Sequence, residues 1–341
     1  MQVSTIGIDL AKNVFQVHGV DAAGKVVVTK KLRRAQMLPL LEKLPACRIG
    51  MEACATSHHW ARALEALGHD VRLMPASYVK AYVKRNKNDA ADAAAICEAV
   101  SRPSMRFVPI KTAEQQSELM LHRTRDLLVR QRTQLINAMR AHLAELGLVA
   151  ARGREGVQSL IALVRDKVSQ LPDLARSALQ ALLNQLDALG QQIANIERHL
   201  HAQHRVNEVS QRLETIPGIG VIDATAIAAT VTDPKVFKSG REFAAWIGLV
   251  PRQNSSGGKE RLGSISKQGD RYLRRLLVIG ATAVIRQART HPEKHPWLIQ
   301  LLARRPAKLV AVALANKTAR IAWAVLVRGG TYRAPALAAR V

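Results

Sequence analysis

An acidic residue inside an apolar strand is the feature that most constrains the fold of this chain. In residues 5–13, TIGIDLAKN, Ile6, Ile8 and Leu10 alternate with small residues, which is the period of a half-buried strand. Asp9 breaks this pattern, and an ionised carboxylate there is costly unless a cation or a metal compensates it. Asp9 is therefore either a ligand or a strand-end residue that faces solvent, and this stretch alone does not decide between them.

The first 105 residues predict an α/β domain. The strand that carries Asp9 is expected to continue through VFQVHGVD, turn at 21–24 and return as KVVVTKKL, forming a β-hairpin with Asp9 on its first arm. A second buried strand is expected to end on Glu52. The remaining helices and strands are expected at 35–43, 56–67 and 70–74.

Two more carboxylates lie on one predicted helix. Asn88 is a suitable N-cap for a helix that runs to about residue 100, and Asp89 and Asp92, three residues apart, project from one face. The positive N-terminus of a helix also favours acidic residues, although this explains one of them better than two. Together with Asp9 and Glu52 they make four carboxylates, a set that can hold two Mg²⁺ ions for phosphoryl transfer.

Basic charge is concentrated in the last third of the chain. The 341 residues include 51 Lys and Arg against 26 Asp and Glu, and residues 206–341 hold 22 of the basic and 8 of the acidic side chains. Such an excess favours nucleic acid as a partner, because basic side chains release counterions from the phosphate backbone. A generally basic protein or one that binds anionic membrane is the alternative. We find no amphipathic basic helix or apolar 18-residue stretch that supports a membrane.

The cysteines, the N-terminus and the aromatic content bear on the cellular compartment and on how a nucleic acid would be recognised. Cys47, Cys54 and Cys97 lack metal-type spacing, and the N-terminus has no secretory signal, which favours a reducing, cytoplasmic location. Aromatic residues make up 4% of the chain, which argues against extensive base stacking. Lys84, Arg85 and Lys87 precede the Asp89 helix and form either a solvated face or a nucleic-acid contact.

Residues 106–205 predict a helical spacer. One long helix is expected over 113–146, and a second carries apolar residues that alternate in steps of three and four, the pattern of a coiled-coil seam. That seam is either a dimerisation arm or the inner face of an intramolecular hairpin with 113–146. Its residues are Leu179, Leu182, Leu186, Leu189, Ile193, Ile196 and Leu200.

The last third begins with a turn between two helical patterns. The Gly-rich turn TIPGIG at 215–220, between two helical patterns, resembles a helix-hairpin-helix. The backbone N–H groups of such a turn, around Gly218 and Gly220, can face a phosphate. An ordinary tight turn explains the same residues. A packed helix is expected to stop at Gly248, and a polar loop follows from 252 to 270, which by default is a surface linker. Its candidate nucleic-acid contacts are Arg252, Lys259, Arg261 and Lys267, and the next helix adds Arg271, Arg274 and Arg275.

These motifs, taken together, resemble one family. GIDLAKN, GMEA and KNDAADA resemble the RuvC-like, ribonuclease-H-fold domain of DEDD-type insertion-sequence transposases of the IS110 family, and most of all its IS1111 branch. GLVPRQNSSGGKERLG resembles the serine motif of the family's C-terminal transposase domain. Ser256 occupies the place of the nucleophile, and Ser255 is a less suitable substitute.

The resemblance implies a mechanism and a set of partners. Asp9, Glu52, Asp89 and Asp92 would bind Mg²⁺, and Ser256 would attack DNA at a composite site assembled across subunits. Donor and target DNA, a guiding non-coding bridge RNA and a homo-oligomer (dimer or tetramer) are implied partners. The implied domains are a RuvC-like domain at 1–105, a coiled-coil spacer at 106–205, a mainly helical transposase domain at 206–330 and a tail at 331–341.

Three other functions are kept as alternatives. A junction-resolvase type of nuclease would use the same carboxylates with water as the nucleophile. An actin-like ATPase or sugar kinase shares a strand like GIDLAK, but we find no second phosphate-binding strand of the Asp-Gly-Gly type. A nucleic-acid-binding protein without catalysis would need none of the four carboxylates.

Overall fold

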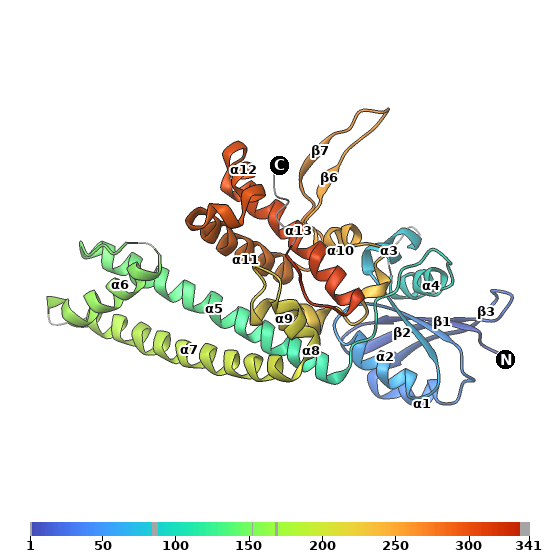
Figure 1. Ribbon diagram of the computed structural model, residues 1–341. Helices are drawn as coiled ribbons and strands as arrows, with labels where there is room; N and C mark the ends of the chain where they lie inside the picture. The colour runs from blue at the N-terminus through green and yellow to red at the C-terminus, as the bar shows by residue number, and fades with distance from the viewer. Residues whose placement is uncertain (1, 84–87, 152, 168–169, 335–341) are drawn as a thin grey trace, which may run out of the picture. The chain divides into compact units, whose positions relative to one another are not determined.

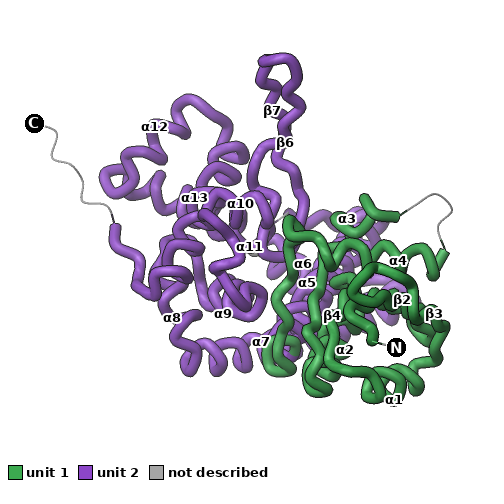
Figure 2. Tube along the Cα trace, turned by 90° about the vertical axis from the view of Figure 1, so that its right-hand side faces the viewer, with its two compact units in different colours: residues 1–116 green, residues 117–341 purple. Residues whose placement is uncertain are grey.

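The computed structural model (Figure 1) describes residues 2–83, 88–151, 153–167 and 170–334. The chain divides into two compact units, residues 1–116 and 117–341 (Figure 2). Lys84, Arg85 and Lys87 lie outside the described residues, as does most of the predicted tail. The predicted domain boundaries at 105 and 205 stay a prediction.

Unit 1 is built on a five-stranded mixed sheet with the order β3-β2-β1-β4-β5. The strand β1 pairs antiparallel with β2 and parallel with β4, which is consistent with a ribonuclease-H-like domain. The strands are β1 (Thr5–Leu10), β2 (Val14–Val20), β3 (Val26–Arg33), β4 (Arg48–Glu52) and β5 (Asp70–Met74).

One expectation about this sheet is wrong. The chain does not continue as one strand from Asp9 through VFQVHGVD, because β1 ends at Leu10 and β2 begins only at Val14. The hairpin of β2 and β3 forms as expected, but Asp9 lies on a separate strand that pairs with β2. Ala11, Lys12 and Asn13 supply the reversal.

Helices cover both faces of the sheet (Figure 1). Ile6, Ile8, Ile49 and Met51 are fully buried on one face, in a cluster with residues of α1 and α2. The opposite face is covered by α4, which contacts β1, β2 and β4. The helices of this unit are α1 (Met37–Leu41), α2 (Ser57–Glu65), α3 (Ala76–Val79) and α4 (Asp89–Val100).

Three helices of unit 2 form an extended arm. The long helices α5 (Ala113–Glu145) and α7 (Asp173–Val206) lie side by side and are joined through α6 (Arg154–Lys167) (Figure 1). Leu179, Leu183 and Leu186 of α7 share a buried cluster with Ile136 and Met139 of α5. The seam is thus buried within one chain, as the intramolecular alternative expects, and a coiled-coil spacer between chains is not confirmed.

The rest of unit 2 is a helical body with one projecting β-hairpin. Its core holds large buried side chains from α8, α9, α10, α11 and α13. The helices are α8 (Glu208–Glu214), α9 (Val221–Thr230), α10 (Gly240–Ile247), α11 (Arg271–Thr290), α12 (Pro296–Arg304) and α13 (Ala307–Arg328). The strands β6 (Pro251–Gln253) and β7 (Leu262–Ile265) make the hairpin.

The helix α13 corrects a second expectation. By length and composition it is apolar enough to cross a membrane, although the sequence suggested no such stretch. Its apolar side is a core side, because Val310, Ala315 and Ala322 are buried against α10 and α11. The helix is therefore explained by packing inside the protein.

Candidate active site

Asp9 and Glu52 lie at the same level of two neighbouring strands. The strands β1 and β4 are parallel, and Ile8 pairs with Met51, so Asp9 and Glu52 each follow that pair by one residue. Alternation along a strand places both carboxylates on the face opposite the buried isoleucines. Both side chains are half-buried. The sheet thus brings together two carboxylates that are 43 positions apart in the chain.

Two glycines bring α4 close to that same face. A β-carbon at Gly7 would overlap backbone atoms of Ala93 and Cys97, and one at Gly50 would lie 2.7 Å from Cβ of Val100. Gly7 and Gly50 are paired in the register and precede Asp9 and Glu52 by two residues. The helix therefore packs directly on the sheet beside the two carboxylates.

Asp89 and Asp92 occupy the first turn of α4. The helix starts where the sequence predicts, because Oδ1 of Asn88 accepts a hydrogen bond of 2.8 Å from the N–H of Ala91. Asp92 is half-buried and directly precedes Ala93, which packs on Gly7. Asp89 is exposed. The helix thus carries both acids at the end that its N-terminal dipole favours.

The donor chemistry of these four residues fits a hard divalent cation. All the donors are carboxylate oxygens, which Mg²⁺ prefers. Within the part of the chain that the structure describes, no group of three or more His, Cys, Asp and Glu side chains is placed to hold a metal ion. Of the four carboxylates, the structure pairs Asp9 with Glu52 through the strand register. Asp89 and Asp92 of α4 do not complete a metal-binding group with them among the described residues.

Two further residues at this edge were missed from the sequence. Gln16 of β2 pairs directly with Asp9 and is 9% exposed, so its amide lies on the same face of the sheet. Cys54 follows Glu52 by two residues. Partial burial raises the pKa of its thiol, and the carboxylates of Glu52 and Asp9 raise it further, so both acids lie near this sulfur. A polar residue at an inward position of VFQVHGV was the available signal for Gln16.

Ser256 lies at the tip of the β6–β7 hairpin. The polar stretch predicted as a loop is folded, because Ser256 bridges Lys259 across Gly257 and Gly258. Both glycines have positive φ, at 54° and 75°, as a two-residue hairpin turn requires. The carbonyl of Ser256 accepts the N–H of Lys259 at 3.1 Å, and residues 251–264 are all exposed. Ser256 is thus fixed in its backbone and open to solvent.

The neighbouring Ser255 is already engaged. Its Oγ accepts a hydrogen bond of 3.2 Å from the N–H of Arg261 on the facing strand. The hydroxyl of Ser255 thereby stabilises the hairpin. This contact gives Ser255, the less suitable substitute in the sequence, a structural role in the hairpin.

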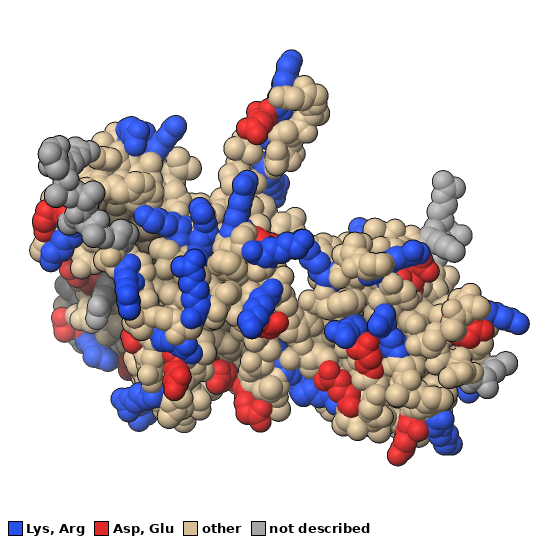
Figure 3. Space-filling view, turned by 45° about the vertical axis from the view of Figure 1, so that its right-hand side comes forward, with Lys and Arg blue, Asp and Glu red and all other residues tan. Residues whose placement is uncertain are grey.

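The predicted basic contacts divide into exposed and engaged residues. Arg252, Lys259, Arg261, Lys267 and Arg271 are exposed. Figure 3 shows Lys and Arg side chains on the projecting hairpin and over the surface beside it. These side chains form a basic surface suited to a phosphate backbone.

Arg274 and Arg275 are used inside the protein. Nη1 of Arg274 donates to the carbonyls of Ile247, at 2.7 Å, and Gln268, at 2.8 Å. The guanidinium of Arg275 forms an ion pair with Asp126 of α5 and lies over the ring of Tyr272. Neither guanidinium is a free donor for a phosphate in this conformation.

The turn between α8 and α9 forms as predicted, but the amide of Gly220 has an internal partner. Gly218 has a φ of 89° and packs against Gly280 of α11. Gly220 is exposed, and its N–H is hydrogen-bonded to the carboxylate of Asp223. A phosphate at Gly220 would therefore compete with Asp223.

A buried polar cluster joins α5 to α11 behind this turn. Nδ1 of His122 lies 3.1 Å from the hydroxyl of Tyr272, and Arg125 pairs with Glu197 of α7 at 2.6 Å. Burial lowers the pKa of His122 to about 4 and raises that of Asp223 to about 6. Nε2 of His122 and Oδ1 of Asp223 are buried without a hydrogen-bond partner among the described residues. Both groups are therefore sensitive to protonation.

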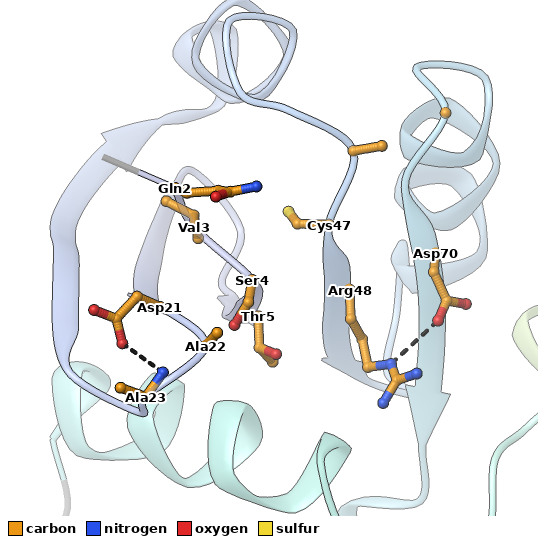
Figure 4. Close-up of a pocket in the computed structure, with 12 residues that line it drawn as sticks. Gln2, Val3, Ser4, Thr5, Asp21, Ala22, Ala23, Cys47, Arg48 and Asp70 are labelled. Carbon is orange, nitrogen blue, oxygen red and sulfur yellow. Dashed lines mark hydrogen bonds and ion pairs between the residues drawn. The ribbon is translucent and has the colours of Figure 1, made fainter.

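The hollow in Figure 4 lies at the other ends of the strands. It has a volume of about 910 Å³ and is lined by the starts of β1 and β4 and by the β2–β3 turn. Its charged groups already have partners within the protein. Nε of Arg48 lies 3.1 Å from the carboxylate of Asp70, and the carboxylate of Asp21 accepts a hydrogen bond of 2.9 Å from the N–H of Ala23. This hollow is separate from Asp9 and Glu52.

Comparisons with known proteins point to one family of transposases. A family model described as transposase, of the DEDD type of IS110 elements, matches residues 6–147, and one described as the IS116/IS110/IS902 transposase family matches residues 210–295. A probable family 20 transposase of Pseudomonas aeruginosa is 51% identical over 98% of this chain and 99% of its own length. The transposase for insertion sequence element IS1111A of Coxiella burnetii is 43% identical over 97% of this chain and 92% of its own length.

These matches define the chain as a DEDD-type transposase, an enzyme that acts on DNA. The chain belongs to the IS116/IS110/IS902 family of transposases. A third relative, the transposase for insertion sequence element IS1328 of Yersinia enterocolitica, is 43% identical over 97% of this chain and 98% of its own length. Membership implies DNA cleavage and recombination.

Proposed function

We propose that this transposase cleaves and exchanges DNA strands in a Mg²⁺-dependent reaction with Ser256 as the nucleophile. The observation that carries the proposal is the in-register pair Asp9 and Glu52 on the sheet face that α4 covers. Two carboxylates on one sheet face, with Asp89 and Asp92 on the helix that covers it, are a donor set for a phosphoryl-transfer site.

Asp9, Glu52, Asp89 and Asp92 would hold the cation. When bound, Mg²⁺ supplies positive charge for the scissile phosphate and for the oxygen that leaves it. Gln16, opposite Asp9, would orient that carboxylate. Binding requires the acids of α4 to approach Asp9 and Glu52 more closely than they do in this structure.

Ser256 would form the new bond. Its Oγ attacks phosphorus, the 3′ or 5′ oxygen of the cleaved strand leaves and takes a proton, and a phosphoserine ester keeps the DNA end attached. The hydroxyl of a second DNA end then displaces the serine. The exposed hairpin tip, with Lys259 and Arg261 nearby in sequence, supports this assignment.

A guide RNA and a homo-oligomer are the proposed partners besides donor and target DNA. The RNA rests on the family resemblance and on the basic excess in residues 206–341. The oligomer, a dimer or tetramer, rests on the resemblance alone, because the arm seam is buried within one chain. Co-purification of RNA with the protein, and recombination by that complex in Mg²⁺, test the RNA, and the molar mass of the complex in solution tests the oligomer.

The test of the nucleophile is Ser256→Ala on labelled donor DNA in the presence of Mg²⁺, with Ser255→Ala as the matched control. We expect Ser256→Ala to abolish the covalent protein–DNA adduct and strand exchange, whereas Ser255→Ala retains both at reduced efficiency. An adduct that persists in Ser256→Ala refutes the assignment. Cleavage without any adduct in the unmodified protein would favour a junction-resolvase type of nuclease.

A further inference from the structure

We propose that Arg274 is a positioning residue, which fixes the root of the Ser256 hairpin and so sets where the tip can reach. The proposal rests on the proposed function, because it gives the hairpin tip a role in the reaction. It replaces the phosphate contact that the sequence suggested for Arg274.

One nitrogen of Arg274 joins the two ends of the hairpin segment. The chain leaves the helical body at Ile247, the last residue of α10, and returns at Gln268, just before α11. Nη1 of Arg274 donates to both carbonyls, at 2.7 and 2.8 Å. The guanidinium therefore ties the outgoing and the returning strand to α11.

The backbone at the root is adapted to this contact. Gly248 has a φ of 82°, and a β-carbon there would lie 2.8 Å from Nη1 of Arg274 and overlap Gln268. The N–H of Lys267 donates to the carbonyl of Gly248 at 3.1 Å, and Lys267 itself has a φ of 55°, which is costly for a residue other than glycine. The surrounding contacts thus hold the root in a conformation that the local sequence disfavours.

Above the root, the hairpin has no support from the body of its unit. Residues 251–264 are all exposed, and an isolated two-stranded hairpin is marginally stable in water. The helix that carries Arg274 is firmly held, because Leu273 and Leu277 are each 1% exposed and Asp270 caps its first turn at 2.9 Å. The direction of the tip is therefore determined at the root, where Arg274 holds both ends of the segment and Nδ2 of Asn316 donates to the carbonyl of Leu249 at 3.1 Å.

The experiment compares Arg274→Ala and Arg274→Lys with Arg271→Ala, which removes an exposed charge from the same turn. We expect Arg274→Ala to speed amide hydrogen exchange at residues 248–268 at least tenfold. The first-order rate of strand exchange on saturating DNA should fall by a similar factor, with DNA affinity within twofold. Arg274→Lys, which can restore one hydrogen bond, should recover part of both effects. Arg271→Ala should weaken DNA binding without changing amide hydrogen exchange at residues 248–268.

Two results would overturn the proposal. One is unchanged hydrogen exchange at 248–268 in a folded Arg274→Ala protein. The other is a loss of DNA affinity with an unchanged rate on saturating DNA, which would restore the phosphate-contact role. Hydrogen exchange does not depend on the chemistry of Ser256, so the two proposals can fail separately. Faster hydrogen exchange at the root in Arg274→Ala, together with a covalent adduct in Ser256→Ala, would refute Ser256 as the nucleophile and support the root contact of Arg274.

Discussion

The α-carbon of Gly7 lies so close to the carbonyl oxygen of Ala93 that no side chain fits between β1 and α4. The contact matters because Asp9 follows Gly7 by two residues and Asp92 directly precedes Ala93. The separation between β1 and α4 thus limits how closely the carboxylates of Asp9 and Asp92 can approach each other.

Gly7→Ala should therefore damage the site through its scaffold. The added methyl group must push α4 away from the sheet, which we expect to cost about 1–3 kcal/mol of unfolding free energy and to abolish DNA cleavage. Gly190→Ala is the control, because a β-carbon there meets nothing within 4 Å and lies inside α7. That change should stabilise the protein by about 0.5–1 kcal/mol. Urea unfolding and a cleavage assay measure both, and full activity in Gly7→Ala would contradict the close-packing argument.

Gln16→Leu should weaken metal binding with little change in fold. The substitution removes the buried amide opposite Asp9 and keeps the volume similar, and loss of such an outer partner lowers metal affinity by roughly 10–100-fold. The half-saturating Mg²⁺ concentration for cleavage should rise accordingly, and Mn²⁺ titration calorimetry should show the same shift. Gln192→Leu, on the exposed side of α7, should leave both values unchanged.

The exposed and the engaged arginines should respond differently to salt. Arg261→Ala should weaken DNA binding and reduce the slope of log affinity against log salt by about 1, as expected for one phosphate contact. Arg275→Ala should leave that slope unchanged and lower stability, because it leaves Asp126 half-buried with fewer partners. Binding titrations at several salt concentrations separate the two, and equal slopes for both variants would show that the Arg275 ion pair opens on DNA.

His122 and Asp223 should give opposite pH dependences of stability. The pKa of His122 is lowered to about 4, so the unfolded chain takes up a proton first and His122 costs stability as pH falls from about 6.5 to 4. The pKa of Asp223 is raised to about 6, so the folded chain takes up the proton first and stability is gained as pH falls from about 6 to 4. Each effect is on the order of 3 kcal/mol and they oppose each other.

Single substitutions should reveal the separate contribution of each group to the dependence of stability on pH. Asp223→Asn should make acidification between pH 6 and 4 more destabilising than in the unmodified protein, whereas His122→Gln should make it less so. Chemical unfolding at half-unit pH intervals is the measurement. Parallel curves for the two variants would show that these groups do not titrate in the folded state as their burial requires.

The sequence predicts most of the sheet of unit 1 because the pattern of its strands is local. Glu52 ends β4, Asp9 is the last residue but one of β1, and Asn88 caps the helix that carries Asp89 and Asp92, so the local pattern assigns each of the four candidates to its element. That Asp9 and Glu52 lie at the same level follows from the parallel register of β1 with β4, which a strand pattern suggests but does not fix. The break at 11–13 was missed because polar residues there are compatible with either a strand or a turn.

The basic residues were less predictable for a tertiary reason. Arg271, Arg274 and Arg275 look alike in RYLRRLL, yet one is exposed, one binds two carbonyls and one pairs with Asp126 about 150 positions away. No local pattern separates them, since the difference depends on which helices surround α11. The hairpin was missed for a related reason, because NSSGGK predicts a turn but the strands beside it are short and fully exposed.

The ladder from Gly248 and Lys267 up to Ser256 and Lys259 has a mechanical consequence. Eight residues of extended chain span ~27 Å, so the hairpin acts as a lever whose fulcrum is its root. A tilt of ~5° at the fulcrum displaces the tip by ~2 Å over that length, which is comparable to the tolerance of a reacting geometry. Small changes at the fulcrum are therefore amplified at Ser256, and under the proposed function a minor rearrangement of the helical body would move the serine toward or away from its substrate.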